Sequence, residues 1–345
     1  MSKKVFIAGG GTGGHFYPAL ATSKYLAEKG YEIFYFGTKY GIEKDKDFVG
    51  KKFLYDIKGI RGKTGKIKSS FKLLKTAFEI KKIIKKEKPD FAICFGGYTS
   101  VPLGIASKLT NTPLFIHEQN SIPSYTNLLL SKIAKKIFIT FDYSFKYFPK
   151  NKTVKTGLPI RKSVKDRLNL KKEEARKILS LDNRKIVLIF GGSQGAKRLN
   201  ELAVNIAKNY SNLLVINIFG KSDYNEELPN LIKFPYYEDM GLLYKVSDIV
   251  ISRSGSGTVN ELIAFGKYSI YIPYPYAASD HQFYNVKWLE EKGLSKVLRE
   301  NQLNKFFEIF DNILKLDITN FEDKIKQFSI LNAEERIYKE IEKVL

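Results

Sequence analysis

The sequence has a single cysteine and no long apolar run. Cys94 lies inside the apolar segment FAICF, so an internal disulfide is excluded and a reducing compartment is expected. The first residues, MSKKVFIAGG, hold too short an apolar stretch for a signal peptide. No segment approaches the roughly 18 apolar residues of a membrane span. Any membrane contact is therefore expected to be peripheral.

Acidic side chains are scarce relative to basic ones. The chain has 36 Asp and Glu against 58 Lys and Arg, a formal net charge of +22. Such an excess indicates an anionic partner: nucleic acid, an anionic membrane surface or a phosphorylated substrate. A proteome rich in lysine explains the same excess, because Ile and Asn are also plentiful. No basic and aromatic recognition motif accompanies the charge, so no nucleic-acid partner is expected.

Apolar runs alternate with helical periodicities in two series, which predicts an α/β fold with two domains. A chain of 345 residues with 43% hydrophobic content exceeds the usual size of one domain. Helices are expected to begin near Gly14, Ser69, Ser100 and Ser124. Repeated strand and helix patterns are typical of parallel, doubly wound sheets, with a linker near residues 156–163. The expected strands are 4–9, 31–37, 90–97, 112–118 and 136–140, then 185–190, 213–220, 247–251 and 268–275, with the last strand signal at 295–299.

Glycine-rich or polar segments follow five of these strands: 9–15, 96–100, 117–120, 191–195 and 252–258. Ligands bind at the carboxyl ends of parallel strands, so these segments are expected to form binding loops. In the first, GGGTGGH, bare backbone ahead of a helix suits a phosphate or sugar, although glycine also serves a purely conformational turn. The chain's three histidines, His15, His117 and His281, all lie at or near such segments.

These segments together resemble one enzyme family. GGGTGGHFYPALA, GGYTSVPLGIA, HEQNSIPSYTN, GGSQGAKRLNE, SRSGSGTVNELIAFGKYSIYIPYP and DHQFYN are similar, in order and spacing, to the MurG family of bacterial N-acetylglucosaminyltransferases. The resemblance covers about Val5 to Gly293. One departure stands at Leu158, where the family has asparagine, so any contact of that amide is in doubt.

The resemblance implies a fold and a reaction. The fold is GT-B, two doubly wound Rossmann-like domains facing across a cleft: residues 1–157 for the acceptor and the membrane, and 158–327 for the donor, with a helix at about 328–345 packing back on the first domain. The family moves N-acetylglucosamine, with inversion, from UDP-N-acetylglucosamine to the C4 hydroxyl of the muramoyl sugar of lipid I. The product is lipid II, for peptidoglycan synthesis. No metal or other cofactor is obligatory.

The resemblance also assigns donor contacts. Ser193 lies near the nucleotide, Arg161 near the uracil, and Tyr237 contacts the uracil edge through its backbone. Glu261 would accept hydrogen bonds from the ribose hydroxyls. Alternatively, its negative charge stabilises the first turn of the helix through the helix dipole. His281, Gln282 and Asn285 would hydrogen-bond the hydroxyls of the donor sugar. The alternative for this stretch is a helix start capped by Asp280. The full donor set is Thr12, Gly13, Gly14, Asn120, Arg161, Ser193, Gln194, Tyr237, Met240, Ser256, Gly257, Thr258, Glu261, His281, Gln282 and Asn285.

The acceptor hydroxyl must lose a proton, and an imidazole has a suitable pKa. His15 is the candidate base, with orienting the acceptor or holding its diphosphate as the alternative. Glu118 is the alternative base, and His117 also competes; Asn120 suits a sugar hydrogen bond. The expected acceptor set is Gly11, Gly14, His15, Gly96, Gly97, Tyr98 and Thr99.

The segment 69–86 predicts an amphipathic helix with two apolar sides. Leu73, Ala77, Ile80, Ile83 and Ile84 form the core side. The other side suits an anionic leaflet, although it could instead pack under the basic loop before it; it holds Phe71, Leu74, Phe78, Lys75 and Lys82. The family resemblance implies attachment to the cytoplasmic face of the bacterial membrane, with cell-wall assembly proteins as partners.

Four other functions remain in view. A transferase acting on another lipid, such as diacylglycerol, would share the donor half. A nicotinamide-dependent oxidoreductase would need an acidic residue at the end of the second strand, and YFGTKYG offers none. A nucleic-acid-binding protein is suggested by charge alone. A non-catalytic membrane scaffold would tolerate loss of both His15 and Glu261.

Overall fold

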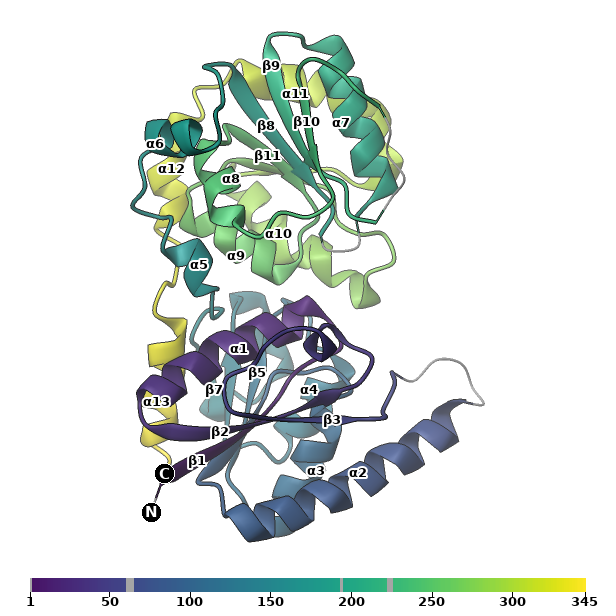
Figure 1. Cartoon of the computed structure of the whole chain (residues 1–345), viewed down its shortest axis with the longest axis vertical. Coiled ribbons are helices and arrows are strands. Elements are labelled where there is room, and N and C mark those ends of the chain that lie inside the picture. Colours follow the sequence, from purple (N-terminus) through teal and green to yellow (C-terminus); the bar gives the residue numbers. More distant parts are fainter. Residues whose placement is uncertain (1, 60–64, 193–194, 222–225) are drawn as a thin grey trace. The chain divides into compact units, whose positions relative to one another are not determined.

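The computed structural model describes residues 2–59, 65–192, 195–221 and 226–345, with the backbone alone at 65–69. The chain divides into two compact units (Figure 1). Unit 1 comprises Met1–Arg161 and Ile330–Leu345, and unit 2 comprises Lys162–Ser329. Each contains a parallel sheet with helices on it, so both doubly wound units expected from the sequence are present.

Unit 1 contains a seven-stranded sheet in the order β3-β2-β1-β4-β5-β6-β7. Every described pair is parallel, with Ile7 opposite Ile93 where β1 meets β4. The strand order reverses between β1 and β4, so the loops after these two strands diverge and leave room for a ligand. The strands are β1 (Lys3–Ala8), β2 (Tyr31–Thr38), β3 (Lys51–Tyr55), β4 (Phe91–Cys94), β5 (Leu114–Glu118), β6 (Lys136–Ile139) and β7 (Thr153–Lys155).

Helices cover both faces of this sheet, which is why its central strands are continuous apolar runs. One core joins Phe16 of α1 and Ile337 of α13 to residues such as Val5 and Phe91. The other contains Ile80 and residues of α3 and α4. The helices are α1 (Gly13–Glu28), α2 (Gly65–Glu87), α3 (Ser100–Thr110), α4 (Tyr125–Ser131) and α13 (Ala333–Glu342).

Unit 2 repeats the design with a six-stranded parallel sheet in the order β10-β9-β8-β11-β12-β13. Here the order reverses between β8 and β11. The strands are β8 (Lys185–Phe190), β9 (Leu213–Ile218), β10 (Leu231–Phe234), β11 (Ile249–Ser252), β12 (Ser269–Tyr271) and β13 (Lys296–Val297). The helices are α5 (Lys162–Lys165), α6 (Lys172–Ile178), α7 (Lys197–Asn209), α8 (Met240–Val246), α9 (Ser256–Ala264), α10 (His281–Glu291), α11 (Phe306–Leu314) and α12 (Thr319–Lys326).

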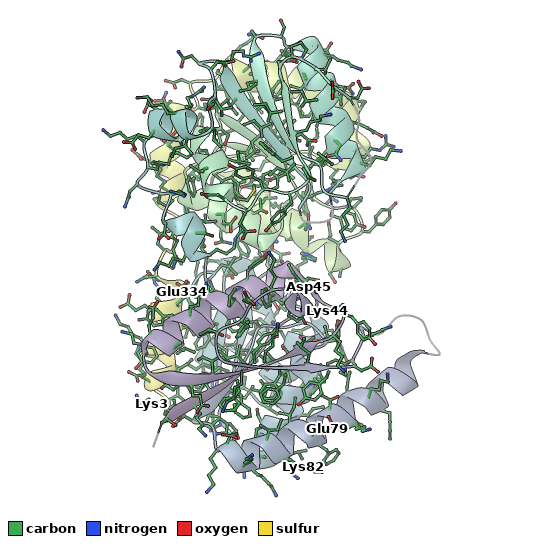
Figure 2. The ribbon with its side chains drawn as sticks, viewed as in Figure 1. Lys3, Lys44, Asp45, Glu79, Lys82 and Glu334 are labelled. Carbon is green, nitrogen blue, oxygen red and sulfur yellow. The ribbon has the colours of Figure 1, made fainter. Side chains whose placement is uncertain are left out.

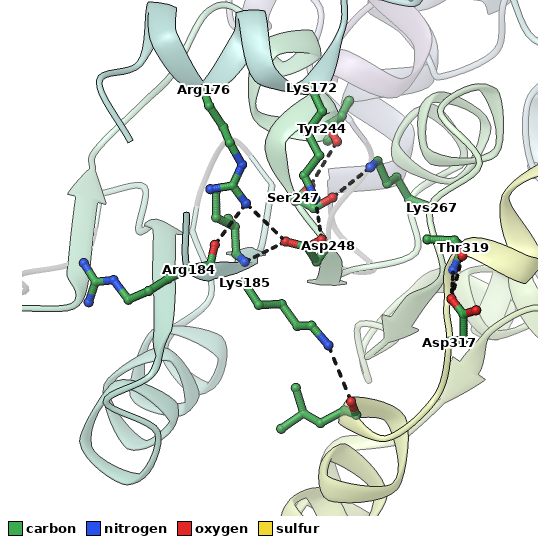
Figure 3. A network of polar contacts seen from close by, with 12 residues as sticks. Lys172, Arg176, Arg184, Lys185, Tyr244, Ser247, Asp248, Lys267, Asp317 and Thr319 are labelled. Carbon is green, nitrogen blue, oxygen red and sulfur yellow. Dashed lines mark hydrogen bonds and ion pairs between the residues drawn. The ribbon is translucent and has the colours of Figure 1, made fainter. Parts of the chain in front are cut away.

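A polar network ties α6 to the amino-terminal ends of β8 and β11 (Figure 3). Asp248 pairs with Lys172, and its Oδ2 lies 3.7 Å from Arg176 Nη2 and accepts a hydrogen bond from the Ile186 backbone N–H at 2.8 Å. Beside it, Lys267 donates to the Ser247 carbonyl at 2.7 Å, and burial lowers the pKa of Lys267 to about 8. These charges lie at the end of the sheet opposite the loops expected to bind ligand.

Candidate functional site

The glycine loop after β1 leads directly into α1. Gly11 has φ +83°, a conformation that glycine adopts without strain. Thr12 is the N-cap of α1, but its side chain does not cap the helix. Instead its hydroxyl lies 3.0 Å from Nδ1 of His15. Because the first amides of a helix lack intrahelical partners, Gly13 and Gly14 present N–H groups suited to an anion.

The imidazole of His15 lies against the glycine loop that follows β4. A Cβ added at Gly96 would approach His15 Cδ2 to 3.2 Å, and one at Gly97 would approach Nδ1 to 3.3 Å. Both glycines also have positive φ, 85° and 73°. Two loops that the sequence placed at separate strand ends therefore meet around one half-buried imidazole.

Several polar groups hold the first glycine loop in place. Tyr35 donates its hydroxyl to the Gly9 carbonyl at 2.8 Å, and Gly10 N–H donates to Thr99 Oγ1 at 3.0 Å. The ring of Tyr98 lies beside Gly11, 3.2 Å from where a Cβ would stand. Thr99, expected at the acceptor, thus supports the loop with its buried hydroxyl. No motif or spacing in the sequence points to Tyr35.

Glu118, the alternative base, is 1% exposed at the end of β5. Its Oε1 accepts from Asn120 N–H at 2.9 Å, and its Oε2 accepts from Ser124 N–H at 3.1 Å and Asn127 Nδ2 at 2.8 Å. Burial raises the pKa of this carboxyl, while these hydrogen bonds oppose the rise. Both oxygens are engaged in shaping the loop that carries Asn120.

His117 is fully buried beside Glu118. Its Nε2 lies 2.9 Å from the Gly157 carbonyl, which can only accept, so Nε2 carries the proton. Its Nδ1 lies 3.3 Å from Gln119 Nε2, which donates to it. Desolvation lowers the pKa of His117 to about 4. The ring is therefore neutral and internal, which suits structure better than proton transfer.

This burial makes unit 1 sensitive to acid. In the unfolded chain His117 binds a proton below about pH 6.5. In the folded chain it binds one only below about pH 4. Stability is therefore expected to fall by about 2 kcal/mol between pH 7 and pH 5 through this group alone. His117→Gln, whose amide can donate to Gly157, should remove this component. Calorimetric melts of wild type, His117→Gln and the half-exposed control His281→Gln at both pH values measure it; an identical pH slope in all three contradicts it.

In unit 2, the loop after β11 opens into the N-terminus of α9. Gly255 is the N-cap without a side-chain cap, and no described heavy atom would lie within 4 Å of a Cβ at Gly255 or Gly257. The amides of Ser256, Gly257 and Thr258 therefore start a helix at an open position, where an anion is favoured. Ser193 and Gln194 lie outside the described residues.

Glu261 lies on α9, 6% exposed, and accepts the Tyr244 hydroxyl on Oε2 at 2.9 Å. The first turn of α9 contains no acidic residue, so the alternative that Glu261 serves the helix dipole there is wrong. Tyr244 was not identified from the sequence, because a tyrosine on the short helix α8 carries no distinguishing pattern.

The side chain of Asp280 does not cap α10, in contrast to the alternative expected from the sequence. Asp280 has φ +55° and makes no side-chain cap; its carboxylate pairs with Arg299 at 2.6 Å instead. That alternative is therefore wrong. His281 Nδ1 donates to the Ala278 carbonyl at 2.8 Å, which assigns the acceptor lone pair to Nε2 in the neutral ring.

The other two sugar-contact candidates on α10 support neighbouring loops. Gln282 Oε1 accepts from Tyr274 N–H at 2.9 Å. Asn285 is fully buried, and its Nδ2 donates to the Ser254 carbonyl at 3.1 Å. Asn285 thus holds the loop that precedes α9.

The remaining donor candidates lie in both units. Tyr237 packs against Phe234, and Met240 begins α8 and is buried. Arg161 belongs to unit 1, where its guanidinium lies 5.1 Å from the ring centre of Tyr17 on α1. Leu158, at the departure from the family pattern, is buried at 2% exposure.

Helix α2 has the two sides that its periodicity predicts. Leu73, Ala77, Ile80 and Ile84 are buried, and Ile83 is half-buried against the core. On the other side Phe71, Leu74 and Phe78 are 70%, 47% and 55% exposed, too much for core residues. Lys75 and Lys82 are exposed beside them, and Figure 2 shows Lys82 extending from the helix. The basic loop that could have covered this side falls largely outside the described residues.

The described part of the chain lacks two features, a membrane-spanning helix and a cluster of metal ligands. None of the described helices combines the length and apolar character needed to cross a bilayer. No three His, Cys, Asp or Glu side chains in the described part of the chain gather as metal ligands would. The expectation that no metal is obligatory stays a prediction.

Comparison with known proteins gives consistent matches over nearly the whole chain. Residues 5–139 match the glycosyltransferase family 28 N-terminal domain, and residues 186–341 match its C-terminal domain. A protein of Sulfurihydrogenibium sp. (strain YO3AOP1) is 49% identical over 98% of both chains. One of Aquifex aeolicus (strain VF5) is 45% identical over 98% of this chain and 99% of its own.

Both relatives carry the name UDP-N-acetylglucosamine--N-acetylmuramyl-(pentapeptide) pyrophosphoryl-undecaprenol N-acetylglucosamine transferase. Among solved structures, the crystal structure of Acinetobacter baumannii MurG matches with a TM-score of 0.78 and 29% identity, covering 99% of both chains.

Proposed function

This chain belongs to glycosyltransferase family 28, and we infer that it is the N-acetylglucosaminyltransferase that converts lipid I to lipid II. The observation that carries this is 49% identity over 98% of both chains to a relative of that name. The chain has the GT-B architecture of two doubly wound units. A transferase for another lipid acceptor is not favoured, because the identity extends through the acceptor loops of unit 1.

Unit 2 binds UDP-N-acetylglucosamine in this proposal. The open N-terminus of α9 at Ser256 to Thr258 supports a diphosphate site, since its amides and the helix dipole favour negative charge. Glu261, one turn further along, supports a ribose contact through its buried carboxylate. His281 Nε2 and the amide of Gln282 are suited to the sugar hydroxyls. When UDP leaves, the α9 amides stabilise its new charge.

Unit 1 binds the acceptor, and His15 acts as the base. The C4 oxygen of the muramoyl sugar attacks C1 of N-acetylglucosamine, the bond from C1 to the diphosphate oxygen breaks, and the hydroxyl proton moves to His15. One displacement inverts the configuration at C1. The absence of a Cβ at Gly96 and Gly97 lets the half-buried imidazole lie against the loop after β4, which supports a fixed position for the base. Glu118 is the weaker candidate, because both of its oxygens are already bonded.

A transfer assay tests the proposed function. Radiolabelled UDP-N-acetylglucosamine is supplied with a lipid I analogue or with diacylglycerol, and the labelled lipid is counted. Label on the lipid I analogue alone supports the proposal. Label on diacylglycerol would replace it with the other lipid transferase, and no label on either would contradict a transferase of this kind.

The exposed side of α2 is proposed to bind the cytoplasmic face of an anionic membrane, where a lipid-linked acceptor resides. Three exposed apolar side chains beside lysines are the composition that an interfacial helix needs. The net charge of +22 acts in the same direction. Association with other cell-wall assembly proteins is a further expectation.

Replacing Phe71, Leu74 and Phe78 together with serine is expected to lower affinity for anionic vesicles at least tenfold. Burying each side chain is worth about 1.5 to 3 kcal/mol when complete, and less at an interface. Residual binding should depend more steeply on salt, because lysines contribute about 1 kcal/mol each. Co-sedimentation measures the loss, and transfer to a short-chain soluble acceptor should survive.

The control replaces two exposed apolar residues of unit 2, Ile178 and Leu316, with serine. Unchanged vesicle binding by the triple variant, with a normal melt, would show that this side of α2 makes no membrane contact.

A further inference from the structure

A buried carboxylate lies beneath the first glycine loop. Glu43 belongs to the short helix Ile42–Lys44, after β2, and is fully buried. Its two oxygens lie 3.0 and 2.9 Å from the Gly11 nitrogen, which donates to both. Oε1 also accepts from Thr38 N–H at 3.0 Å. One side chain therefore joins the loop after β1 to the end of β2.

The surrounding sequence is shaped to admit this carboxylate. A Cβ at Gly10 would stand 2.1 Å from Glu43 Oε1, and one at Gly41 would stand 2.1 Å from Oε2. A Cβ at Gly37 would stand 3.0 Å from Glu43 Cγ. Gly10 and Gly41 thus leave room for the Glu43 carboxylate, and Gly37 leaves room for both Glu43 and Tyr35. Gly37 and Gly41 lie outside the glycine loop, and the buried side chains explain why they lack a Cβ.

The choice of a charged group here is costly. No lysine or arginine in the described part of the chain pairs with the Glu43 carboxylate; Lys52 donates to its backbone carbonyl instead. An unpaired buried charge is unfavourable unless hydrogen bonds stabilise it. Oε1 accepts from both the Gly11 and the Thr38 amides, and Oε2 accepts from Gly11 as well. The isosteric carboxamide has one acceptor oxygen, so whichever way it is turned its NH₂ group would face the Gly11 N–H, donor against donor. A second acceptor atom facing Gly11 is therefore the property that requires glutamate.

We propose that Glu43 is a positioning residue that fixes the glycine loop for the acceptor, and this rests on the acceptor site proposed above for unit 1. Because Glu43 occupies the Gly11 amide, that amide does not bind the acceptor anion. The N–H groups of Gly13 and Gly14 at the start of α1 do so instead. The loop is held in its binding conformation before the acceptor arrives, so less conformational freedom is lost on binding.

Glu43→Gln tests this in the full-length enzyme. The expected result is a KM for a soluble lipid I analogue raised at least tenfold, with the Kd for UDP-N-acetylglucosamine within twofold of wild type. A loss of folded enzyme would lower kcat and leave KM unchanged, so the KM distinguishes positioning from stability. The matched control is Asp45→Asn, which removes the same charge from an exposed residue two positions along (Figure 2).

Hydrogen exchange supplies a second readout that needs no acceptor. The Gly11 amide is expected to be protected in wild type and Asp45→Asn, and to exchange at least tenfold faster in Glu43→Gln. A KM within twofold of wild type, or unchanged exchange, overturns the proposal. If Glu43→Gln does not fold, Glu43→Asp, which keeps a carboxyl group on a side chain one methylene shorter, is judged by the same criteria. Absence of transfer by the wild type would instead overturn the proposed function.

Discussion

Replacing His15 with alanine is expected to lower kcat by roughly 10²- to 10⁴-fold, the usual contribution of a general base. Donor affinity should be nearly unchanged, because His15 lies in unit 1 and the proposed donor contacts at α9 lie in unit 2. A base must be unprotonated to act, so the wild-type rate falls as the pH drops through its pKa. That acidic limb of the kcat profile should disappear in the variant. Steady-state kinetics from pH 5.5 to pH 9 provide the measurement.

Two further variants separate proton transfer from orientation. His15→Gln can hydrogen-bond but cannot accept the proton, so it should be as slow as His15→Ala. Thr12→Val removes the hydroxyl 3.0 Å from Nδ1 and should cost less, because the base itself remains. A glutamine variant with near-normal kcat, or an alanine variant that keeps the acidic limb, would assign the base elsewhere.

Replacing Glu261 with alanine is expected to weaken UDP-N-acetylglucosamine binding by about 1 to 3 kcal/mol, the range for hydroxyls left without partners. This corresponds to roughly five- to 150-fold in Kd. Calorimetric titration measures it, and near-UV circular dichroism reports on the fold.

The control for Glu261 is Tyr244→Phe, which removes the bond at 2.9 Å but keeps the carboxylate. It should bind the donor within about threefold of wild type, since its effect is limited to orientation. Donor affinity unchanged in a folded Glu261→Ala variant would exclude the ribose contact.

The central strands could be predicted because both of their faces are buried. Strands such as Lys185–Phe190 and Leu213–Ile218 are unbroken apolar runs, which any count of hydrophobic residues detects. The strands that sequence analysis did not identify, Lys51–Tyr55, Thr153–Lys155 and Leu231–Phe234, all lie at sheet edges. An edge strand is short and partly exposed, so its composition resembles that of a loop.

The residues of the candidate site likewise include some that the sequence predicts and some that only the fold reveals. The glycine loops and His15 were identified because many small or polar residues follow apolar strands, a pattern visible in one dimension. Glu43 was not, although an acidic residue was sought at the end of the second strand. It lies five residues beyond Thr38, and only the folded turn brings it under Gly11. Likewise, the salt bridge from Asp280 to Arg299 joins segments that sequence spacing alone does not connect.

The chain leaves unit 1 at Arg161 and returns at Ile330, and this order affects how the protein is made. Ile337 and Ile341 of α13 are fully buried in the core that also contains Val5 and Phe91. During translation this core stays open until the ribosome has produced all of unit 2. Unit 2, which is continuous in sequence, can fold as soon as it emerges. The amino-terminal half must therefore wait with apolar surface uncovered, which makes it the part of the nascent chain most in need of chaperone protection.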